Sequence, residues 1–207
     1  MDAILEAAVR VLGQHGAAGL TTRRVADVAG VSVGSFYQYF PNKEAVLAEL
    51  VRRRVDGLVS VLEAACAAAT GGVVEASAGV IRAFLDEKRR YMPVSRVLGP
   101  ALVLVEGRRI MAEGAQRLHA VFAAMLERAG RRPLTAGERT RLAVALSAVE
   151  GAVANAVEHD PSRFADPEFE DALLGLFLGA FGWEQARWGG AGERPAEPVS
   201  DRVRTHA

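Results

Sequence analysis

Apolar residues recur three and four positions apart along most of this 207-residue chain, which is the period of an amphipathic α-helix. The alternation that marks β-strands is absent. Glycine, proline and N-cap residues divide the pattern into segments. It predicts helices over about 4–14, 21–29, 33–40, 43–69 and 73–90, a short irregular or helical piece between 92 and 100, and helices ending near 128, 159 and 187. We therefore expect an all-α protein of about nine helices.

The starts and ends of several predicted helices carry capping residues. Thr21, Ser32 and Asn42 can each accept a hydrogen bond from a free backbone N–H of the following turn. Gly30 suits the left-handed conformation that often follows a helix. Residues 135–138, Thr-Ala-Gly-Glu, form a capping-box pattern, and residues 166–168 place a proline behind a capping aspartate. The two short helices around Gly30 are therefore joined by a tight turn.

The apolar residues of these two short helices share one face. Val25, Val28 and Ala29 form a stripe on the first, and Phe36 and Phe40 lie four apart on the second. We expect these five side chains to point into the protein. The remaining face of the second helix then points outward and carries hydroxyl, aromatic and amide groups.

This outward face suits double-stranded DNA. Hydroxyl and basic side chains bind phosphates, Ser35 and Gln38 can read base edges, and Arg23 can pair with a guanine or a phosphate. Val33 can contact a thymine methyl group, and Gly34 lets the backbone approach closely. The expected DNA contacts are Thr22, Arg23, Ser32, Val33, Gly34, Ser35, Tyr37, Gln38, Tyr39 and Lys43.

An ordinary helical hairpin with a solvated polar face is the alternative interpretation. A solvated face has no need of its tyrosines, however, and Asp27 is the only acidic residue between positions 20 and 43. The whole chain has no formal net charge, with 25 basic and 25 acidic residues. Binding to any polyanion through net charge is therefore not expected, whereas a local basic surface near the N-terminus remains open.

The run from Thr21 to Glu44 resembles the DNA-binding domain of the tetracycline-repressor (TetR) family. The matching positions are Thr21, Thr22, Val25, Ala26, Ala29, Gly30, Val31, Ser32, Gly34, Phe36, Tyr37, Tyr39, Phe40, Asn42, Lys43 and Glu44. Tyr39 stands where the family often has histidine, and Phe36 where it often has leucine. The resemblance covers about the first 50 residues and extends beyond them only in length and helical pattern.

The resemblance and the helical pattern together suggest three regions. We expect a DNA-binding domain over 1–48, with its helix-turn-helix motif at 21–40, and a helical regulatory and dimerisation domain over 49–188. Residues 189–207 are rich in glycine, proline and charge, which predicts a disordered tail.

The last two long helices carry apolar stripes that predict a dimer interface, formed as a four-helix bundle about a two-fold axis. The expected contacts are Leu142, Leu146, Val149, Val153, Phe169, Leu173, Phe177 and Phe181. The alternative is that these residues complete the core of one protomer. The family resemblance implies a homodimer.

The middle helices mix methionine, aromatic and a few polar residues, which suits an apolar ligand. The candidate pocket residues are Phe84, Tyr91, Met92, Arg96, Leu102, Ile110, Met111, His119 and Phe122. Taken residue by residue, an ordinary core explains them equally well. The family resemblance implies an inducer pocket among these helices.

Other functional classes find little support. Nucleotide-binding and hydrolase motifs are absent, and the four histidines lack metal-ligand spacing, so we expect no enzyme activity, cofactor or metal. The single cysteine, Cys66, excludes an internal disulfide and suits a small buried apolar position. Acidic residues near Met1 argue against a signal peptide, and uncharged stretches look too short to span a membrane. We expect a cytoplasmic protein.

The sequence thus predicts a homodimeric transcriptional regulator that binds a palindromic operator. The resemblance implies a repressor that a small, largely apolar effector releases from DNA. Two alternatives remain. One is a constitutive regulator without an inducer, and the other is a helical binding protein that does not bind DNA.

Overall fold

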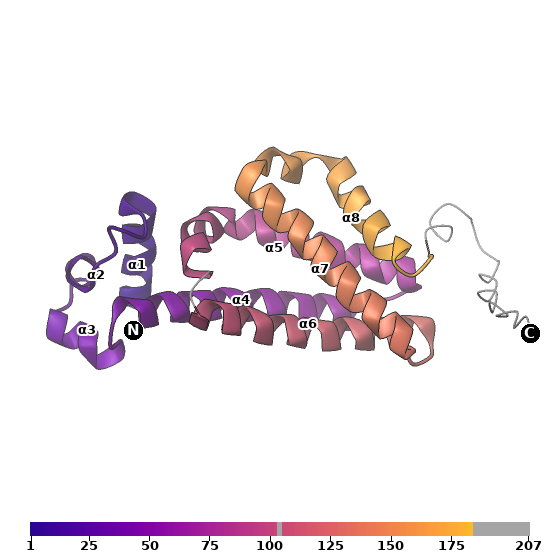
Figure 1. Cartoon of the computed structure of the whole chain (residues 1–207), viewed down its shortest axis with the longest axis horizontal. Coiled ribbons are helices and arrows are strands. Elements are labelled where there is room, and N and C mark those ends of the chain that lie inside the picture. The colour runs from indigo at the N-terminus through magenta and orange to yellow at the C-terminus, as the bar shows by residue number, and fades with distance from the viewer. Residues whose placement is uncertain (103–104, 184–207) are drawn as a thin grey trace, which may run out of the picture.

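A computed structural model describes the backbone of residues 1–102 and 105–183 and the side chains of 1–99 and 106–183. Within these residues the protein is entirely helical, as predicted (Figure 1). The elements are α1 (Asp2–His15), α2 (Thr22–Ala29), α3 (Val33–Tyr39), α4 (Lys43–Ala68), α5 (Val73–Leu102), α6 (Val105–Gly130), α7 (Ala136–His159), the 3-10 helix η1 (Pro161–Ala165) and α8 (Pro167–Gly179). The expected tail at 189–207 lies outside the described residues.

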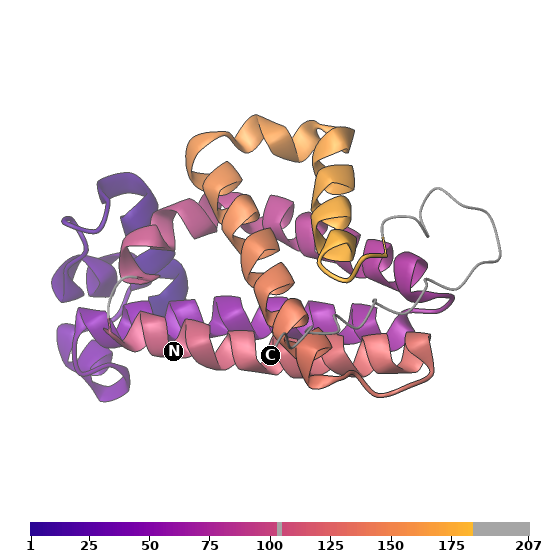
Figure 2. The same ribbon diagram turned by 45° about the vertical axis from the view of Figure 1, so that its right-hand side comes forward.

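Three short helices form one end of the molecule, and the long helices extend away from them. Figures 1 and 2 show α4 and α6 side by side along the long axis, with α7 crossing them and α8 beyond. Helix α4 begins beside α3 and continues without a break into the long-helix region. The expected boundary between residues 48 and 49 therefore falls inside one continuous helix.

The predicted caps are present at the ends of these helices. The Thr21, Ser32 and Asn42 side chains accept backbone N–H bonds at 3.2, 3.0 and 2.8 Å. Gly30 has φ 70° and ψ 28°, the left-handed conformation expected after α2. The capping box at Thr135 is also complete at the start of α7. Short-range hydrogen bonding thus explains why α2 and α3 begin and end where the sequence predicts.

Helix α5 is longer than predicted. The sequence suggested an end near residue 90, before Pro93, yet the helix continues to Leu102. A proline inside a helix removes one backbone hydrogen bond and favours a bend, and Figure 1 shows the far end of α5 turning toward α4. Packing of Val94, Val97 and Leu98 against the N-terminal helices compensates for the missing bond.

Two other local predictions are wrong. The last helix ends at Gly179 instead of near 187, because the chain turns at Gly182, which has φ 71°. Val28 was assigned to the apolar face of α2, but its side chain is 40% exposed. In an eight-residue helix, Val25 and Ala26 already fill the buried face, so Val28 is left outside.

The buried apolar residues form two clusters. The N-terminal core unites α1, α2, α3 and the start of α4, and it also includes Leu98 of α5 and Ile110 of α6. The C-terminal core joins the rest of α4 with α5, α6, α7 and α8. Helices α4, α5 and α6 therefore contribute to both cores, so a movement of these helices acts on both.

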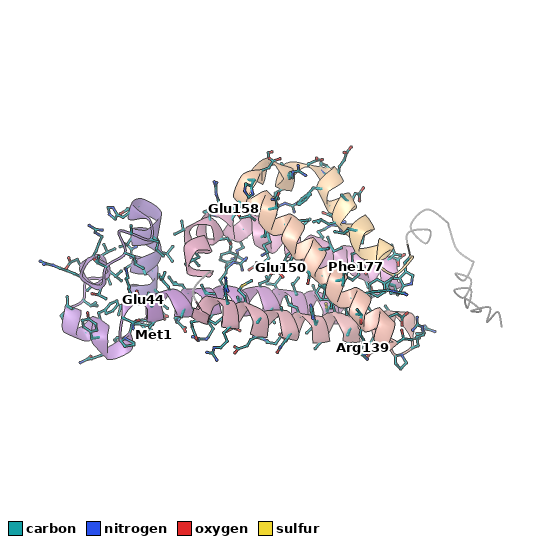
Figure 3. All side chains as sticks on the ribbon, in the orientation of Figure 1. Met1, Glu44, Arg139, Glu150, Glu158 and Phe177 are labelled. Atoms are coloured by element: carbon teal, nitrogen blue, oxygen red, sulfur yellow. The ribbon has the colours of Figure 1, made fainter. Side chains whose placement is uncertain are left out.

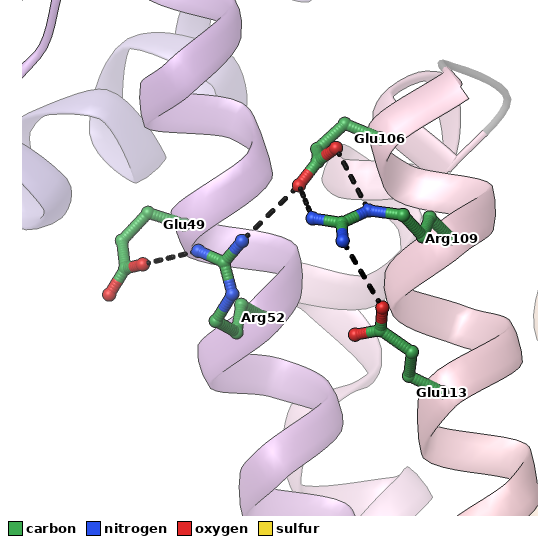
Figure 4. Close-up of polar contacts among 5 residues, drawn as sticks. All are labelled: Glu49, Arg52, Glu106, Arg109 and Glu113. Atoms are coloured by element: carbon green, nitrogen blue, oxygen red, sulfur yellow. Dashed lines mark hydrogen bonds and ion pairs between the residues drawn. The ribbon is translucent and has the colours of Figure 1, made fainter.

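Ion pairs tie α4 to α6 near the junction of the two cores (Figure 4). Arg52 contacts Glu49 at 2.9 Å and reaches Glu106 of α6 at 3.3 Å, while Arg109 bonds Glu106 at 2.6 Å and Glu113 at 3.3 Å. The hydrogen bond from Arg109 lowers the pKa of Glu106. Because these groups are largely exposed, the pairs add little to stability and serve mainly to fix the register of α4 and α6.

The two long helices also approach closely at Gly114. A Cβ atom placed on Gly114 would lie 2.3 Å from Cγ1 of Val55. Real carbon atoms cannot come so near, so glycine is required at this crossing of α4 and α6.

Helix α7 is more apolar than we predicted from the sequence. Its 24 residues are long and apolar enough to cross a membrane by length and composition, contrary to the expectation that no stretch would be. Leu142, Ala145 and Val153 of this helix lie in the C-terminal core, as a core helix requires. Val144 of the same helix is 63% exposed, so not all of its large apolar side chains are covered within the protomer.

Candidate nucleic-acid interface and regulatory cavity

Two phenylalanines anchor helix α3 in the N-terminal core. Phe36 is fully buried and Phe40 is 6% exposed, with their ring centroids 6.1 Å apart. The Phe36 and Tyr37 rings also pack in a T-shaped arrangement, with their centroids 5.6 Å apart. This packing fixes one face of α3 inward, as predicted, and leaves the opposite face at the end of the molecule farthest from α8 (Figure 1).

The structure places the ten expected DNA contacts together on this outer surface. None is buried, and only Thr22, Ser35 and Lys43 are partly covered. Tyr37 and Tyr39 are 52% and 56% exposed, and Val33 is 40% exposed. Large apolar and aromatic side chains in water are unfavourable unless another molecule covers them, so this face has the character of a binding surface.

Hydroxyl groups on this surface are already positioned by one another. The Thr22 and Tyr37 hydroxyl oxygens are 3.4 Å apart and link α2 to α3. The Ser32 and Ser35 hydroxyl oxygens are 2.9 Å apart, while Ser32 also accepts the Ser35 N–H. Ser32 is therefore engaged as a helix cap, and Tyr37 is held where its hydroxyl can meet a phosphate.

Gly34 has no internal role in the fold. A Cβ atom at this position would meet only Oγ of Ser32, at an ordinary contact distance of 3.7 Å. Glycine within a helix lowers stability relative to alanine. The missing side chain leaves the α3 backbone open to close approach by another molecule.

Few of the basic residues near the N-terminus are free for phosphates. Arg53 pairs with Asp2 at 2.8 Å and Glu49 at 3.1 Å, Arg52 pairs with acidic residues of α4 and α6, and Arg54 is bound to Glu87. Arg24 donates to the carbonyl of Gly19 at 2.6 Å. Arg10, Arg23 and Lys43 form no ion pair with the described residues and remain available.

The residues expected at the dimer interface lie mostly inside one protomer. Leu142, Val149, Val153, Leu173, Phe177 and Phe181 are buried in the C-terminal core, and Leu146 and Phe169 pack against it. These residues therefore belong to the core of one protomer, as the alternative interpretation of the sequence held. Their stripes were correctly read as apolar, but α7 and α8 bury them against α5 and α6.

The exposed apolar residues of the same two helices were not among the residues predicted from the sequence. Val144 is 63% exposed and Leu176 is 45% exposed, the largest apolar groups left in solvent on α7 and α8. Ala148 and Gly151 extend the α7 face, and Ala172 extends that of α8. A small-residue spacing in the sequence hints at this face, but only the structure separates it from the buried one.

The expected pocket residues divide into three groups. Phe84, His119 and Phe122 line one small cavity between α4, α5, α6, α7 and α8. Ile110 instead belongs to the N-terminal core, Arg96 is exposed, and Tyr91, Met92 and Met111 are partly buried away from the cavity lining. The side chain of Leu102 lies outside the described residues.

This cavity has a volume of about 50 Å³ and a mainly apolar lining. Residues absent from the sequence prediction complete it, namely Leu58, Leu62, Ile81, Leu118, Leu146, Val149, Glu150 and Phe177. Their contribution could not be read from the sequence because they come from five helices. A volume of this size holds only a few atoms, so a larger ligand requires the helices to move.

Cys66 is 2% exposed, and burial raises the pKa of its thiol to about 11. This agrees with the expected role as a small core residue, because a reactive cysteine needs an accessible thiolate. Among the described residues no group of three or more histidine, cysteine or acidic side chains could hold a metal ion.

Known proteins resemble this chain at two levels. Residues 4–50 match the family model of bacterial regulatory proteins of the tetR family. The HTH-type transcriptional repressor AcnR of Corynebacterium glutamicum is 32% identical over 88 residues, a match that covers 42% of either chain. The present chain thus matches less than half the length of this curated relative.

Solved structures share the complete fold. A putative transcriptional regulator from Pseudomonas aeruginosa PAO1 aligns with a TM-score of 0.69 at 20% identity, over 89% of this chain and 92% of its own. The multidrug binding protein EbrR, complexed with imidazole, aligns with a TM-score of 0.67 at 23% identity, over 86% and 93%. A TetR-family regulator from Streptomyces coelicolor gives 0.60 at 24% identity, over 87% and 96%. Residues 4–50 thus place a helix-turn-helix domain similar to that of the tetR family of bacterial regulatory proteins at the N-terminus of the chain.

Proposed function

We propose that this protein is a homodimeric transcriptional repressor that binds a palindromic operator and releases it when a small molecule enters the C-terminal core. One observation carries the proposal. Seven large hydrophobic side chains are exposed among the described residues, and all except Met1 lie on two surfaces. Val28, Val33, Tyr37 and Tyr39 lie on or beside α3, whereas Val144 and Leu176 lie on α7 and α8.

The first surface suits the major groove of DNA. Helix α3 presents Val33, Gly34 and Gln38 outward, where they can meet base edges and a thymine methyl group. Tyr37, Tyr39 and Lys43 border that face and can bind phosphates, which set the register of the helix in the groove. AcnR is described as a transcriptional repressor, and its similarity supports the same activity here.

The second surface suits a second copy of the chain. Two-fold pairing through the uncovered faces of α7 and α8 would bury Val144 and Leu176, and the small residues Ala148 and Gly151 would permit close helix packing. Such pairing places two α3 helices on one face of the duplex, about 34–36 Å apart or somewhat more for a longer operator. A palindromic operator follows from that symmetry.

Release by an effector follows from helices shared between the two cores. Ile81 and Phe84 of α5 line the cavity, while Leu98 of the same helix packs in the N-terminal core. A ligand that opens the cavity by displacing α5 or α6 would move helices that also contact the core that orients α3. Such a ligand acts only through its different affinity for the DNA-bound and free conformers.

Selection from random duplex DNA followed by fluorescence anisotropy tests the DNA-binding function. We expect a palindromic sequence to be enriched. Lys43→Gln should weaken binding and reduce the dependence of log K on log salt by about 0.9 for each lost phosphate contact, whereas Tyr37→Phe should weaken binding without changing that slope. Failure to enrich any sequence would support the DNA-independent alternative.

Sedimentation equilibrium tests the dimer. Leu176→Arg should convert the protein to a monomer with unchanged helix content, because the side chain is exposed in the protomer. Leu173→Arg, on the buried face of the same helix, should instead unfold the C-terminal core. Monomeric wild-type protein at micromolar concentration would contradict the proposed interface.

A further inference from the structure

The lining of the cavity in the C-terminal core includes two polar side chains. Nine of its lining residues are apolar, and the other two are His119 and Glu150. Figure 3 shows Glu150 near the middle of α7, with Phe177 on α8. The Phe122 and Phe177 rings, 6.2 Å apart, form part of the apolar wall. A ligand in this space therefore meets aromatic rings, a carboxylate and an imidazole.

Lys88 of α5 lies beside one of the lining residues. Lys88 follows the lining residue Phe84 by one helical turn, and its ammonium lies over the Phe84 ring, 5.0 Å from the centroid. Burial lowers the pKa of Lys88, and the nearby Glu150 carboxylate acts in the opposite direction. Lys88 and Glu150 nonetheless form no ion pair within 4.0 Å. The two opposite charges thus influence each other without forming an ion pair.

The neighbouring charges are already compensated. Arg54 bonds the buried Glu87 carboxylate at 3.0 Å and lies over the Tyr91 ring at 4.5 Å. This pair contributes no net charge to the cavity. One positive and one negative group, Lys88 and Glu150, are therefore left to interact with a ligand.

An ionic ligand of either sign is disfavoured by this arrangement. An anion drawn to Lys88 would face Glu150, and a cation drawn to Glu150 would face Lys88; like charges placed side by side cost up to several kcal/mol. We propose that the cavity binds a small electroneutral amphiphile whose head accepts a hydrogen bond from Lys88 and donates one to Glu150, with its apolar body against Phe84, Phe122 and Phe177. A short alkyl amide is the simplest molecule of this class.

This inference rests on the proposed effector function, because it concerns the same cavity. The volume of the cavity also limits the size of the ligand. A water molecule needs about 10–15 Å³ of such volume, so the cavity of about 50 Å³ holds a short chain and not a large polycyclic compound.

Isothermal titration calorimetry on the free protein tests the proposal with three matched probes, hexanamide, hexanoate and hexylammonium, at about pH 7.5, where the last two are ionised. Wild-type protein should bind hexanamide at least about tenfold more tightly than either ion. Glu150→Gln should raise the affinity for hexanoate above that for hexylammonium, and Lys88→Gln should do the reverse. Glu150 is exposed, so its variant is expected to fold, and thermal melts followed by circular dichroism check both variants.

Tightest binding of either ion to the wild type, no binding of any probe, or an unchanged order of affinities in both variants would overturn the proposal. Because these titrations contain no DNA, they are independent of operator release. If hexanamide binds as expected but the operator complex persists at saturating hexanamide, the ligand class stands and the effector function fails.

Discussion

Gly34→Ala separates the stability of the fold from the affinity for DNA. The added methyl group meets only Ser32 Oγ, at 3.7 Å, so it causes no clash within the protomer. Glycine costs about 0.5–1 kcal/mol relative to alanine within a helix, and Gly34 lies in the first turn, so a gain near 0.5 kcal/mol is reasonable. For a protein of this size such a gain raises Tm by about 1–2 °C.

The same methyl group would occupy the surface that faces the duplex. A methyl group forced into a well-packed contact costs about 1–3 kcal/mol. If each α3 loses about 1–2 kcal/mol, a dimer loses about 2–4 kcal/mol, which corresponds to a roughly 30- to 1000-fold weaker operator complex. Fluorescence anisotropy with the selected operator measures this loss, and differential scanning calorimetry measures the change in Tm.

Gly57→Ala is the matched control for this comparison. Gly57 is an exposed glycine within α4 with no atom within 4 Å of a new Cβ, so its replacement should raise Tm without changing operator affinity. If Gly34→Ala raised Tm and bound the operator as tightly as wild type, the reasoning that places the α3 backbone against DNA would be refuted.

Three further predictions follow from contacts elsewhere in the protein. Gly114→Ala should lower the free energy of unfolding by about 1–3 kcal/mol, because its methyl group would meet Val55 at 2.3 Å, and Val55→Ala should restore most of the loss in a urea-unfolding cycle; additive losses would contradict this explanation. Cys66 should react with Ellman's reagent at about pH 8 only after unfolding, since burial raises the pKa of its thiol to about 11; rapid reaction of the native protein would show that the thiol is accessible. Hydrogen bonds from Arg132 and Thr135 lower the pKa of Glu138 from 4.5 to about 2, so its stabilising contribution is complete above about pH 4.5 and is lost as the pH falls toward 2. Glu138→Gln should therefore flatten the dependence of stability on pH in that range, and an unchanged slope would exclude the capping-box carboxylate as its source.

The sequence was most informative where structure is local. Capping residues and a glycine in the left-handed conformation define α2 and α3 within a few positions, so the helix-turn-helix could be located from residues 21–42 alone. The inward direction of Phe36 and Phe40 follows from their spacing of four. The exposed binding surface is then the remainder of the helix.

Longer-range features could not be derived in this way. Pro93 looked like the end of a helix, but contacts from Val94 and Leu98 to the N-terminal core keep α5 continuous. The apolar stripes of α7 and α8 do not reveal whether a helix of the same chain or of another chain covers them. Residues predicted at a dimer interface, such as Leu142 and Phe177, are buried within the protomer, whereas Val144 of the same region is exposed.

The cavity illustrates the same limit. Phe84 and Phe122 were predicted as lining residues, whereas Glu150 was not, because it comes from a helix assigned to dimerisation. Arg52, Arg53 and Arg54 are consecutive basic residues in the sequence, yet carboxylates from α1, α4, α5 and α6 pair with them. Charge counted along a sequence overestimates the charge available to DNA when such pairs form.

Hydroxyl-radical footprinting of the protein on its selected duplex tests the central claim most directly. Two α3 helices related by a two-fold axis should protect two patches on one face of the DNA, centred about one helical turn apart or somewhat more, and Gly34→Ala should weaken both patches equally. A single protected patch, or no protection at concentrations that saturate anisotropy, would contradict the account.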